Sequence, residues 1–197
     1  MNALLIPLII FATATCITPG PNNIMLTSSG ANFGFKRTIP HILGIAFGLI
    51  ALMASTAAGL GILLRQFPEI QFTLKVVGCI YLLFLSWKIA TIAPVRQEKS
   101  KSRPLTFFEA VLFQFLNPKA LVMAFSAISA FTIAGRDYIP SVIQVTLVFF
   151  IICIPAISFW AGFGVAIGRL LNTPHRFRVF NLSLGTLTAS SVVFIIF

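Results

Sequence analysis

Charged side chains are scarce in this sequence, and acidic ones are the scarcest. Only 9% of the 197 residues are charged, with 14 Lys and Arg against 4 Asp and Glu. Hydrophobic residues make up 58%, and the mean hydropathy is +1.00. In soluble domains about a quarter of the residues are Asp, Glu, Lys or Arg. The composition therefore excludes an ordinary soluble domain and predicts an integral membrane protein.

Histidine and cysteine are also few. The two histidines, His41 and His175, lie far apart in the sequence, and the three cysteines are Cys16, Cys79 and Cys153. The sequence has no CxxC pair and no His–Cys cluster, so we predict neither a metal site nor a cofactor. A membrane-embedded hydrolase would need a nucleophile with a base, or a metal cluster. We therefore expect no enzyme activity and interpret the cysteines as small buried side chains.

The uncharged stretches are long. Residues 38–64, 138–168 and 179–197 contain no Asp, Glu, Lys or Arg, and about 20 apolar residues are enough for a helix to cross a bilayer. The sequence predicts an all-α integral membrane protein in the lipid bilayer. Its six transmembrane helices are expected at residues 3–35, 39–64, 70–93, 105–134, 140–167 and 179–197.

The net charge of +10 does not indicate a nucleic-acid partner, because such proteins gather basic residues on one face or stripe. Here the basic residues lie in alternate connections between the apolar segments, whereas the intervening connections hold only Arg65 and Arg136. This asymmetry is typical of cytoplasmic loops. With six spans it predicts that both termini lie outside. The nine residues of the basic connections are Lys36, Arg37, Arg96, Lys99, Lys101, Arg103, Arg169, Arg176 and Arg178.

A polar linker at residues 95–104 divides the chain into two halves, residues 1–94 and 105–197. We expect three spans in each half and a cytoplasmic linker. An odd number of spans turns the second half upside down relative to the first, which is the inverted-repeat plan of many transporters. The second and fifth segments each carry a glycine pair, Gly44 with Gly48 and Gly164 with Gly168. Close helix packing is the ordinary explanation of such pairs.

Prolines interrupt the first and fourth segments, within TPGPNN at residues 18–23 and NPK at residues 117–119. Each proline lacks an amide proton and frees the carbonyl four residues earlier, here those of Thr15, Ile17 and Gln114. Such groups persist at membrane depth only where protein or water satisfies them. The alternative is that each proline merely kinks a continuous helix.

Two broken helices can hold a zwitterion. The amide end of a downstream half attracts a carboxylate, and the carbonyl end of an upstream half attracts an ammonium. We therefore expect a substrate site at both interruptions. Its predicted residues are Thr18, Pro19, Gly20, Pro21, Asn22, Asn23, Asn117, Pro118 and Lys119.

Two ionisable residues of the fourth segment, Glu109 and Lys119, are candidates for proton coupling. Lys119 lies ~20 Å into the segment if the helix is continuous, and an ionisable residue at that depth indicates a function. In the alternative, the segment lies shallower and Lys119 reaches an interface. Glu109 lies one turn inside, where it suits an interface, and it is also the one carboxylate near a cytoplasmic opening.

The chain resembles the LysE family of amino-acid exporters, and within it the cysteine and O-acetylserine exporter branch. The resemblance implies a six-span exporter of the bacterial inner membrane, driven by the proton gradient, with its site between the two proline motifs. Ser86 stands where the family more often has glycine. The motifs that carry the resemblance are TPGPNN at 18–23, GFKR at 34–37, LGIAFG at 43–48, YLLFLSWK at 81–88 and FQFLNPKA at 113–120.

Two rival functions use the same broken helices. A small-solute channel of the half-helix kind needs two half-helices beyond six spans, and the chain has no apolar segment to spare. A membrane thiol or electron carrier would use Cys16 at the first break, with a partner cysteine expected near residues 114–120, where none is found.

A cationic amino acid would need a further carboxylate at depth. The four acidic residues fall in loops or near an interface: Glu69, Glu98, Glu109 and Asp137. We therefore expect export of small neutral amino acids, with cysteine and O-acetylserine first and serine, threonine or homoserine next. The sequence leaves open whether the chain forms a homo-oligomer.

Overall fold

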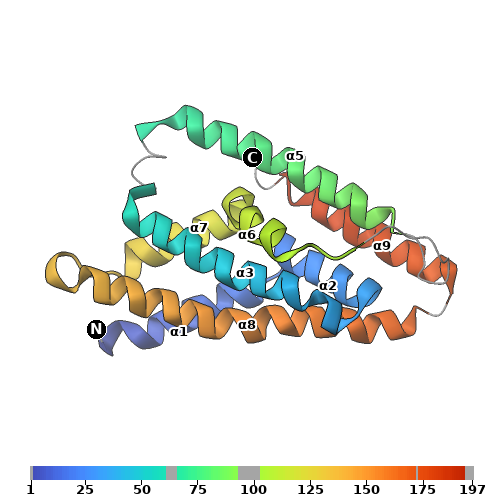
Figure 1. Ribbon diagram of the computed structural model, residues 1–197, viewed down its shortest axis with the longest axis horizontal. Helices are drawn as coiled ribbons and strands as arrows, with labels where there is room; N and C mark the ends of the chain where they lie inside the picture. The colour runs from blue at the N-terminus through green and yellow to red at the C-terminus, as the bar shows by residue number, and fades with distance from the viewer. Residues whose placement is uncertain (1, 61–65, 93–102, 172, 194–197) are drawn as a thin grey trace.

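The computed structural model describes residues 2–60, 66–92, 103–171 and 173–193, and every regular element in these ranges is a helix (Figure 1). The predicted all-α class is confirmed. Most of the predicted linker, residues 95–102, lies outside the described ranges.

The first predicted segment is two helices, α1 (Asn2–Ile17) and α2 (Pro21–Phe33). Gly20 between them is extended, with φ −171° and ψ 177°, and Pro21 occupies the first turn of α2. A proline fits there because the first amides of a helix have no intrahelical acceptor. The two helices meet at a bend of 54°.

The fourth predicted segment is broken in the same way, into α6 (Phe107–Leu116) and α7 (Pro118–Phe131). Asn117 ends α6 in an extended conformation and caps α7, its side-chain oxygen accepting a hydrogen bond from the Lys119 amide at 3.1 Å. The bend here is 70°. Both proline motifs therefore break their helices rather than merely kinking them.

Four further helices complete the described fold: α3 (Phe35–Ser55), α5 (Pro68–Ala90), α8 (Tyr138–Leu170) and α9 (Pro174–Ser190). Short segments adjoin two of them, the π-helical η1 (Thr56–Leu60) after α3 and the 3₁₀-helical η2 (Gly135–Asp137) before α8.

Three stretches of the described chain are long and apolar enough to cross a membrane: Phe35–Gly59, Phe72–Ala90 and Gly135–Leu170. The count reaches five if each bent pair is one span. Helix α9 is not among them, and it begins at Pro174, before the predicted start at residue 179. A multi-pass membrane protein is supported, whereas the sixth span stays a prediction.

The connections group at two ends of the molecule. Figure 1 places the start of α3, the end of α8 and the start of α9 at the right-hand end, and the N-terminus, the end of α3 and the start of α8 at the left-hand end. The right-hand elements carry basic residues, among them Lys36, Arg37 and Arg169, whereas the left-hand end carries Arg136 together with Asp137. The alternation of basic connections read from the sequence thus corresponds to two opposite ends in space.

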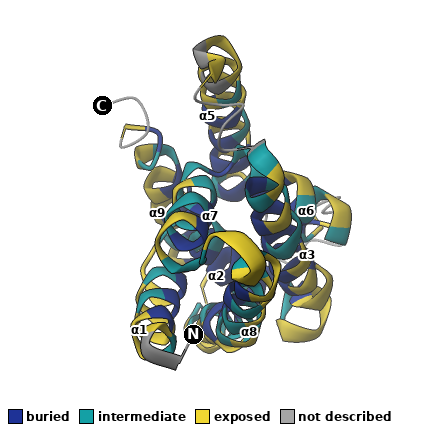
Figure 2. Cartoon of the chain, turned by 90° about the vertical axis from the view of Figure 1, so that its left-hand side faces the viewer, coloured by how far each residue is buried: buried dark blue, intermediate teal, exposed yellow. Residues whose placement is uncertain are grey.

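Helix α2 lies in the middle of the bundle, with the other helices around it (Figure 2). Most of its residues are buried, including the polar Asn23, Ser28, Ser29 and Asn32. The Asn32 amide exchanges hydrogen bonds of 2.9 and 3.1 Å with the amide of Asn181 on α9. A buried polar group is costly unless it is hydrogen-bonded, and this pair satisfies both amides.

The glycine pairs serve close helix packing, as expected. A Cβ at Gly48 of α3 would lie 2.6 Å from Gln114 Cγ of α6, and one at Gly168 of α8 would lie 2.7 Å from the Ala31 carbonyl oxygen of α2. The glycine pair of α3 therefore packs on α6, which precedes the second break. The glycine pair of α8 packs on α2, which follows the first break. The two pairs do not occupy matching places, and the inverted repeat stays a prediction.

Large apolar side chains face outward on α5 and α8, among them Phe72, Ile80 and Trp87 of α5 and Ile151 of α8. Soluble monomers rarely expose apolar patches of this extent. The outward faces, yellow in Figure 2, suit contact with lipid.

Candidate functional site

The two helix breaks meet at Lys119. Its ammonium reaches from the first turn of α7 to the other break, where it donates hydrogen bonds to the Thr18 carbonyl at 2.6 Å and to Thr18 Oγ1 at 2.9 Å. The aliphatic stem of Lys119 lies against Gly20, where an added Cβ would be 2.7 Å from Lys119 Cδ. A residue larger than glycine at position 20 would collide with the side chain that joins the breaks.

The carbonyls at the end of α1 are satisfied by side chains. Pro19 and Pro21 free the carbonyls of Thr15 and Ile17. Thr18 Oγ1 donates to the Thr15 carbonyl at 3.1 Å, and Trp160 Nε1 of α8 donates to the Ile17 carbonyl at 3.1 Å. Asn23 Nδ2 also donates to the carbonyls of Cys16 and Thr18, at 3.1 and 2.7 Å. The carbonyl end of α1 is therefore a cluster of acceptors held in place by the chain itself.

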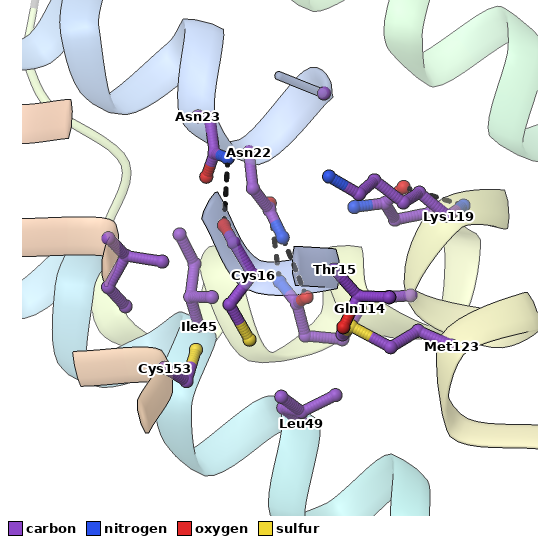
Figure 3. A pocket seen from close by; sticks show the side chains of 14 residues that line it. Thr15, Cys16, Asn22, Asn23, Ile45, Leu49, Gln114, Lys119, Met123 and Cys153 are labelled. Atoms are coloured by element: carbon purple, nitrogen blue, oxygen red, sulfur yellow. Dashed lines mark hydrogen bonds between the residues drawn. The ribbon is translucent and has the colours of Figure 1, made fainter. Parts of the chain in front are cut away.

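A second contact joins the breaks through amide side chains. Asn22 Nδ2 of α2 donates to Gln114 Oε1 of α6 at 2.9 Å, as the dashed lines of Figure 3 mark, and Gln114 Nε2 donates to the Ala110 carbonyl at 2.9 Å. Gln114 is almost fully buried. Its side chain was not predicted as part of the site. The sequence signal for its role was a polar amide in an apolar segment, one turn before the break at Asn117 and Pro118.

The starts of α2 and α7 differ in their capping. Asn117 caps α7, whereas Gly20, the N-cap of α2, supplies no side-chain hydrogen bond. The first amides of a helix have no intrahelical acceptor and carry the positive end of its dipole. The start of α2 is thus the end better suited to an anionic group.

A small cavity of ≈ 30 Å³ lies between the breaks, with Asn22, Gln114 and Lys119 among its lining residues (Figure 3). This volume corresponds to about one water molecule. A larger cavity of ≈ 490 Å³ adjoins it and is lined by Pro19, Pro118 and Ser126 among others. Lys119 and Gly20 line both, so the stem of Lys119 lies at the junction of the two spaces.

The structure brings all nine predicted site residues together. Gly20, Asn22, Asn23, Asn117 and Lys119 line the small cavity, and the three prolines, Pro19, Pro21 and Pro118, line the larger one. Thr18 lines neither, is exposed and accepts from Lys119. Whether these residues bind substrate stays a prediction.

The three cysteines are buried, as expected, and Cys16 of α1 lies close to Cys153 of α8. Both are buried, both line the small cavity, and Figure 3 shows their side chains close together. A thiol carrier was expected to have its second cysteine near residues 114–120, whereas the cysteine beside Cys16 is Cys153 of α8. The third cysteine, Cys79, belongs to α5 and to a different core cluster.

The side chain of Glu109 is held at the start of α6, about two turns before the break. Its carboxylate binds both terminal nitrogens of Arg103 at 2.7 Å and accepts from the Thr106 amide at 2.7 Å in a capping box. This ion pair raises the pKa of the Arg103 guanidinium. The carboxylate lines neither cavity, so the structure separates it from Lys119.

Comparisons with known proteins agree with this architecture. Residues 13–197 match the LysE type translocator family. A cysteine/O-acetylserine efflux protein of Salmonella paratyphi A is 32% identical over 178 residues, which cover 90% of this chain and 89% of that protein. A protein of the same description from Escherichia coli K12 is 28% identical over 167 residues, covering 84% and 85% of the two chains. No solved structure matches.

Proposed function

Because this chain belongs to the LysE type translocator family, we propose that it exports small neutral amino acids across the bacterial inner membrane, driven by the proton gradient. Cysteine and O-acetylserine are the first candidate substrates, because the relatives at about 30% identity are named for their efflux. Serine, threonine and homoserine follow, since they are also small and uncharged in the side chain.

One observation carries the proposal: an ammonium already sits on the carbonyl cluster at the end of α1. Lys119 Nζ lies 2.6 Å from the Thr18 carbonyl oxygen. The α-ammonium of an amino acid has the same charge and donor groups as this side chain. A substrate that takes these acceptors displaces the Lys119 ammonium, which then pairs with the substrate carboxylate beside the uncapped start of α2.

The two cavities agree with this exchange. The small one is too small for an amino acid, whereas the larger one has room, and the Lys119 stem lies between them. Movement of that stem away from Gly20 would join the two spaces. Binding of the substrate and release of the Lys119 contact are then one event.

The lining also favours a neutral substrate side chain. No carboxylate from the described residues lines either cavity. A lysine or arginine side chain would stay unpaired there, and a buried unpaired charge costs several kcal/mol. The thiols of Cys16 and Cys153 and the side chain of Met123 instead offer a soft, weakly polar surface.

We further propose the arrangement in the membrane expected from the sequence: six spans as two inverted halves, residues 1–94 and 105–197, with both termini outside. The basic connections at one end of the molecule support a single cytoplasmic side.

Transport in inverted membrane vesicles tests the function directly. With the lumen acidified, we expect accumulation of labelled cysteine, O-acetylserine or serine to exceed that of vesicles without the protein, and to collapse when a protonophore removes the gradient. Accumulation of none of the small neutral amino acids would overturn the proposal.

A second candidate, the thiol carrier, rests on the placement of Cys16 and Cys153 at one cavity. The double variant Cys16→Ser, Cys153→Ser separates the two functions, because electron transfer through a cysteine pair requires both thiols. We expect the double variant to retain gradient-driven export, with Cys79→Ser as the matched control. Export by the double variant at the parental level would refute the carrier.

A further inference from the structure

His41 of α3 is buried without a hydrogen-bonding partner. The residue is 1% exposed, and neither ring nitrogen has a partner among the described residues. A neutral imidazole carries one donor and one acceptor, and leaving a buried polar group unpaired costs about 1–3 kcal/mol. Buried groups of this kind are commonly satisfied by water.

The ring lines a third cavity, separate from the two at the helix breaks. Its volume is ≈ 50 Å³, and its polar lining consists of His41, Ser28 and Ser29 of α2, and Lys88 of α5. The space suffices for one or two water molecules and is too small for an amino acid. Its ligand is therefore water or a hydrated proton.

Among the polar side chains that line this cavity, His41 is the one whose ordinary pKa lies nearest neutral pH. The polar side chains that α2 supplies to the cavity are hydroxyls, α5 supplies the cationic Lys88, and no carboxylate lines it within the described ranges. The carboxylate of Glu109 on α6 is held by Arg103 and Thr106. On α3 itself, Lys36 and Arg37 are cationic and exposed, with Arg37 stacked over the Phe33 ring.

His41 is also connected to the candidate substrate site by short, rigid paths. Ile45, one turn further along α3, and Leu49, the turn after that, line the small cavity between the breaks. One helical turn is about 5.4 Å. Helix α2 makes a second connection, since Asn22 and Asn23 at its start line the substrate cavity whereas Ser28 and Ser29 line the His41 cavity. A change of packing around His41 therefore moves two elements of the substrate site.

We infer that the cavity around His41 is the proton-binding site that couples export to the proton gradient; this rests on the proposed function. The free ring nitrogen takes the proton from water while the cavity communicates with the outside and gives it up to water while the cavity communicates with the cytoplasm, with no other bond made or broken. An imidazolium in a dry cavity is costly. Protonation therefore favours the opened packing of α2 and α3, and deprotonation favours the closed one.

The two histidines of the chain provide a matched pair for the test. His175 is exposed at the start of α9, so His175→Gln is the control for His41→Gln. In inverted vesicles we expect His41→Gln to lose gradient-driven uptake by about tenfold or more, because the glutamine amide does not take up a proton in this pH range. Exchange of labelled for unlabelled substrate without a gradient should stay within about twofold of the parent, because exchange needs no proton.

Two results in these vesicles would overturn the inference: gradient-driven uptake that survives in His41→Gln, or equal loss of uptake and exchange in a normally inserted variant. The first would leave the proposed function intact. If instead the parent itself takes up no neutral amino acid, the proposed function fails first.

A spectroscopic measurement keeps the inference testable if His41→Gln does not insert. In the His175→Gln protein, His41 is the sole histidine, and nitrogen NMR of labelled histidine reads its protonation directly. We expect the ring to titrate and its midpoint to shift when cysteine is added to the purified protein. A ring that stays neutral between about pH 5 and 9, with and without substrate, would contradict a proton-binding role.

Discussion

The ammonium of Lys119 and the carbonyl of Thr18 lie 2.6 Å apart although they belong to different helix breaks. Proline creates each break locally, and this contact joins them. We expect Lys119→Met to abolish export while the protein inserts at the parental level, because the apolar stem can neither occupy the carbonyl cluster nor pair with a carboxylate. Export assays with quantified membrane levels test this, and Lys36→Met, an exposed cation, is the control. Normal export by Lys119→Met would mean that the contact is structural.

Asn22 and Gln114 should behave as one unit. Removing Asn22 leaves the buried Gln114 oxygen without this donor, at a cost of about 1–3 kcal/mol, and removing Gln114 leaves the part-buried Asn22 amide without its acceptor. We expect Asn22→Ala and Gln114→Ala each to weaken substrate binding by about tenfold, and the double variant to be no worse than the poorer single one. Binding of labelled substrate to the purified parent, the two single variants and the double variant completes this double-mutant cycle. Fully additive losses would show that the two side chains act separately.

A side chain at Gly20 should disturb the contact between the two breaks. A Cβ would lie 2.7 Å from Lys119 Cδ, so Gly20→Ala must displace the lysine stem that joins the two breaks. We expect export to fall by about tenfold or more, because a displacement of roughly 1 Å at a positioned group costs that much. Gly162→Ala is the matched control, since a Cβ there meets nothing within 4 Å. Equal activities of the two variants would contradict the role of Gly20.

The orientation in the membrane can be measured with fused reporters. The basic connections predict that a reporter near Lys99 lies in the cytoplasm, and that reporters at Asp137 and at the C-terminus lie outside. A cytoplasmic C-terminus would contradict both the six spans and the inverted repeat. It would also leave α9 as a helix that does not cross, in agreement with its absence from the membrane-crossing helices of the described chain.

Competition defines the substrate class. In acidified inverted vesicles, excess cysteine or O-acetylserine should block uptake of the labelled neutral substrate, whereas arginine and lysine should leave it within about twofold of the uninhibited rate. The reason is that no described carboxylate lines the cavities to pair with a cationic side chain, whose unpaired charge is costly. Inhibition by arginine alone would refute the proposed substrate class.

The breaks were predictable because their cause is local. A proline lacks the amide proton that a helix interior needs, and Pro21 and Pro118 stand in the first turns of α2 and α7. Pro40 and Pro155 lie inside continuous helices, so the polar residues beside the prolines of the two motifs were part of the signal. The long uncharged stretches determined the all-α membrane class for a similar reason, since a bilayer accepts no unsatisfied backbone. The nine proposed site residues followed from these two local properties.

The partners of the site residues came only from the tertiary structure. Sequence reasoning placed Cys16 beside a break but missed Cys153 of α8, and it missed the Gln114 side chain and Trp160. It also gave His41 no role, because its burial against α2 and α5 is a property of the packed bundle. In a soluble helix an apolar stripe marks the buried face. A membrane helix is apolar all round, so its sequence does not determine which faces meet, and only the packing of α2, α3, α6 and α8 decided which side chains share a cavity.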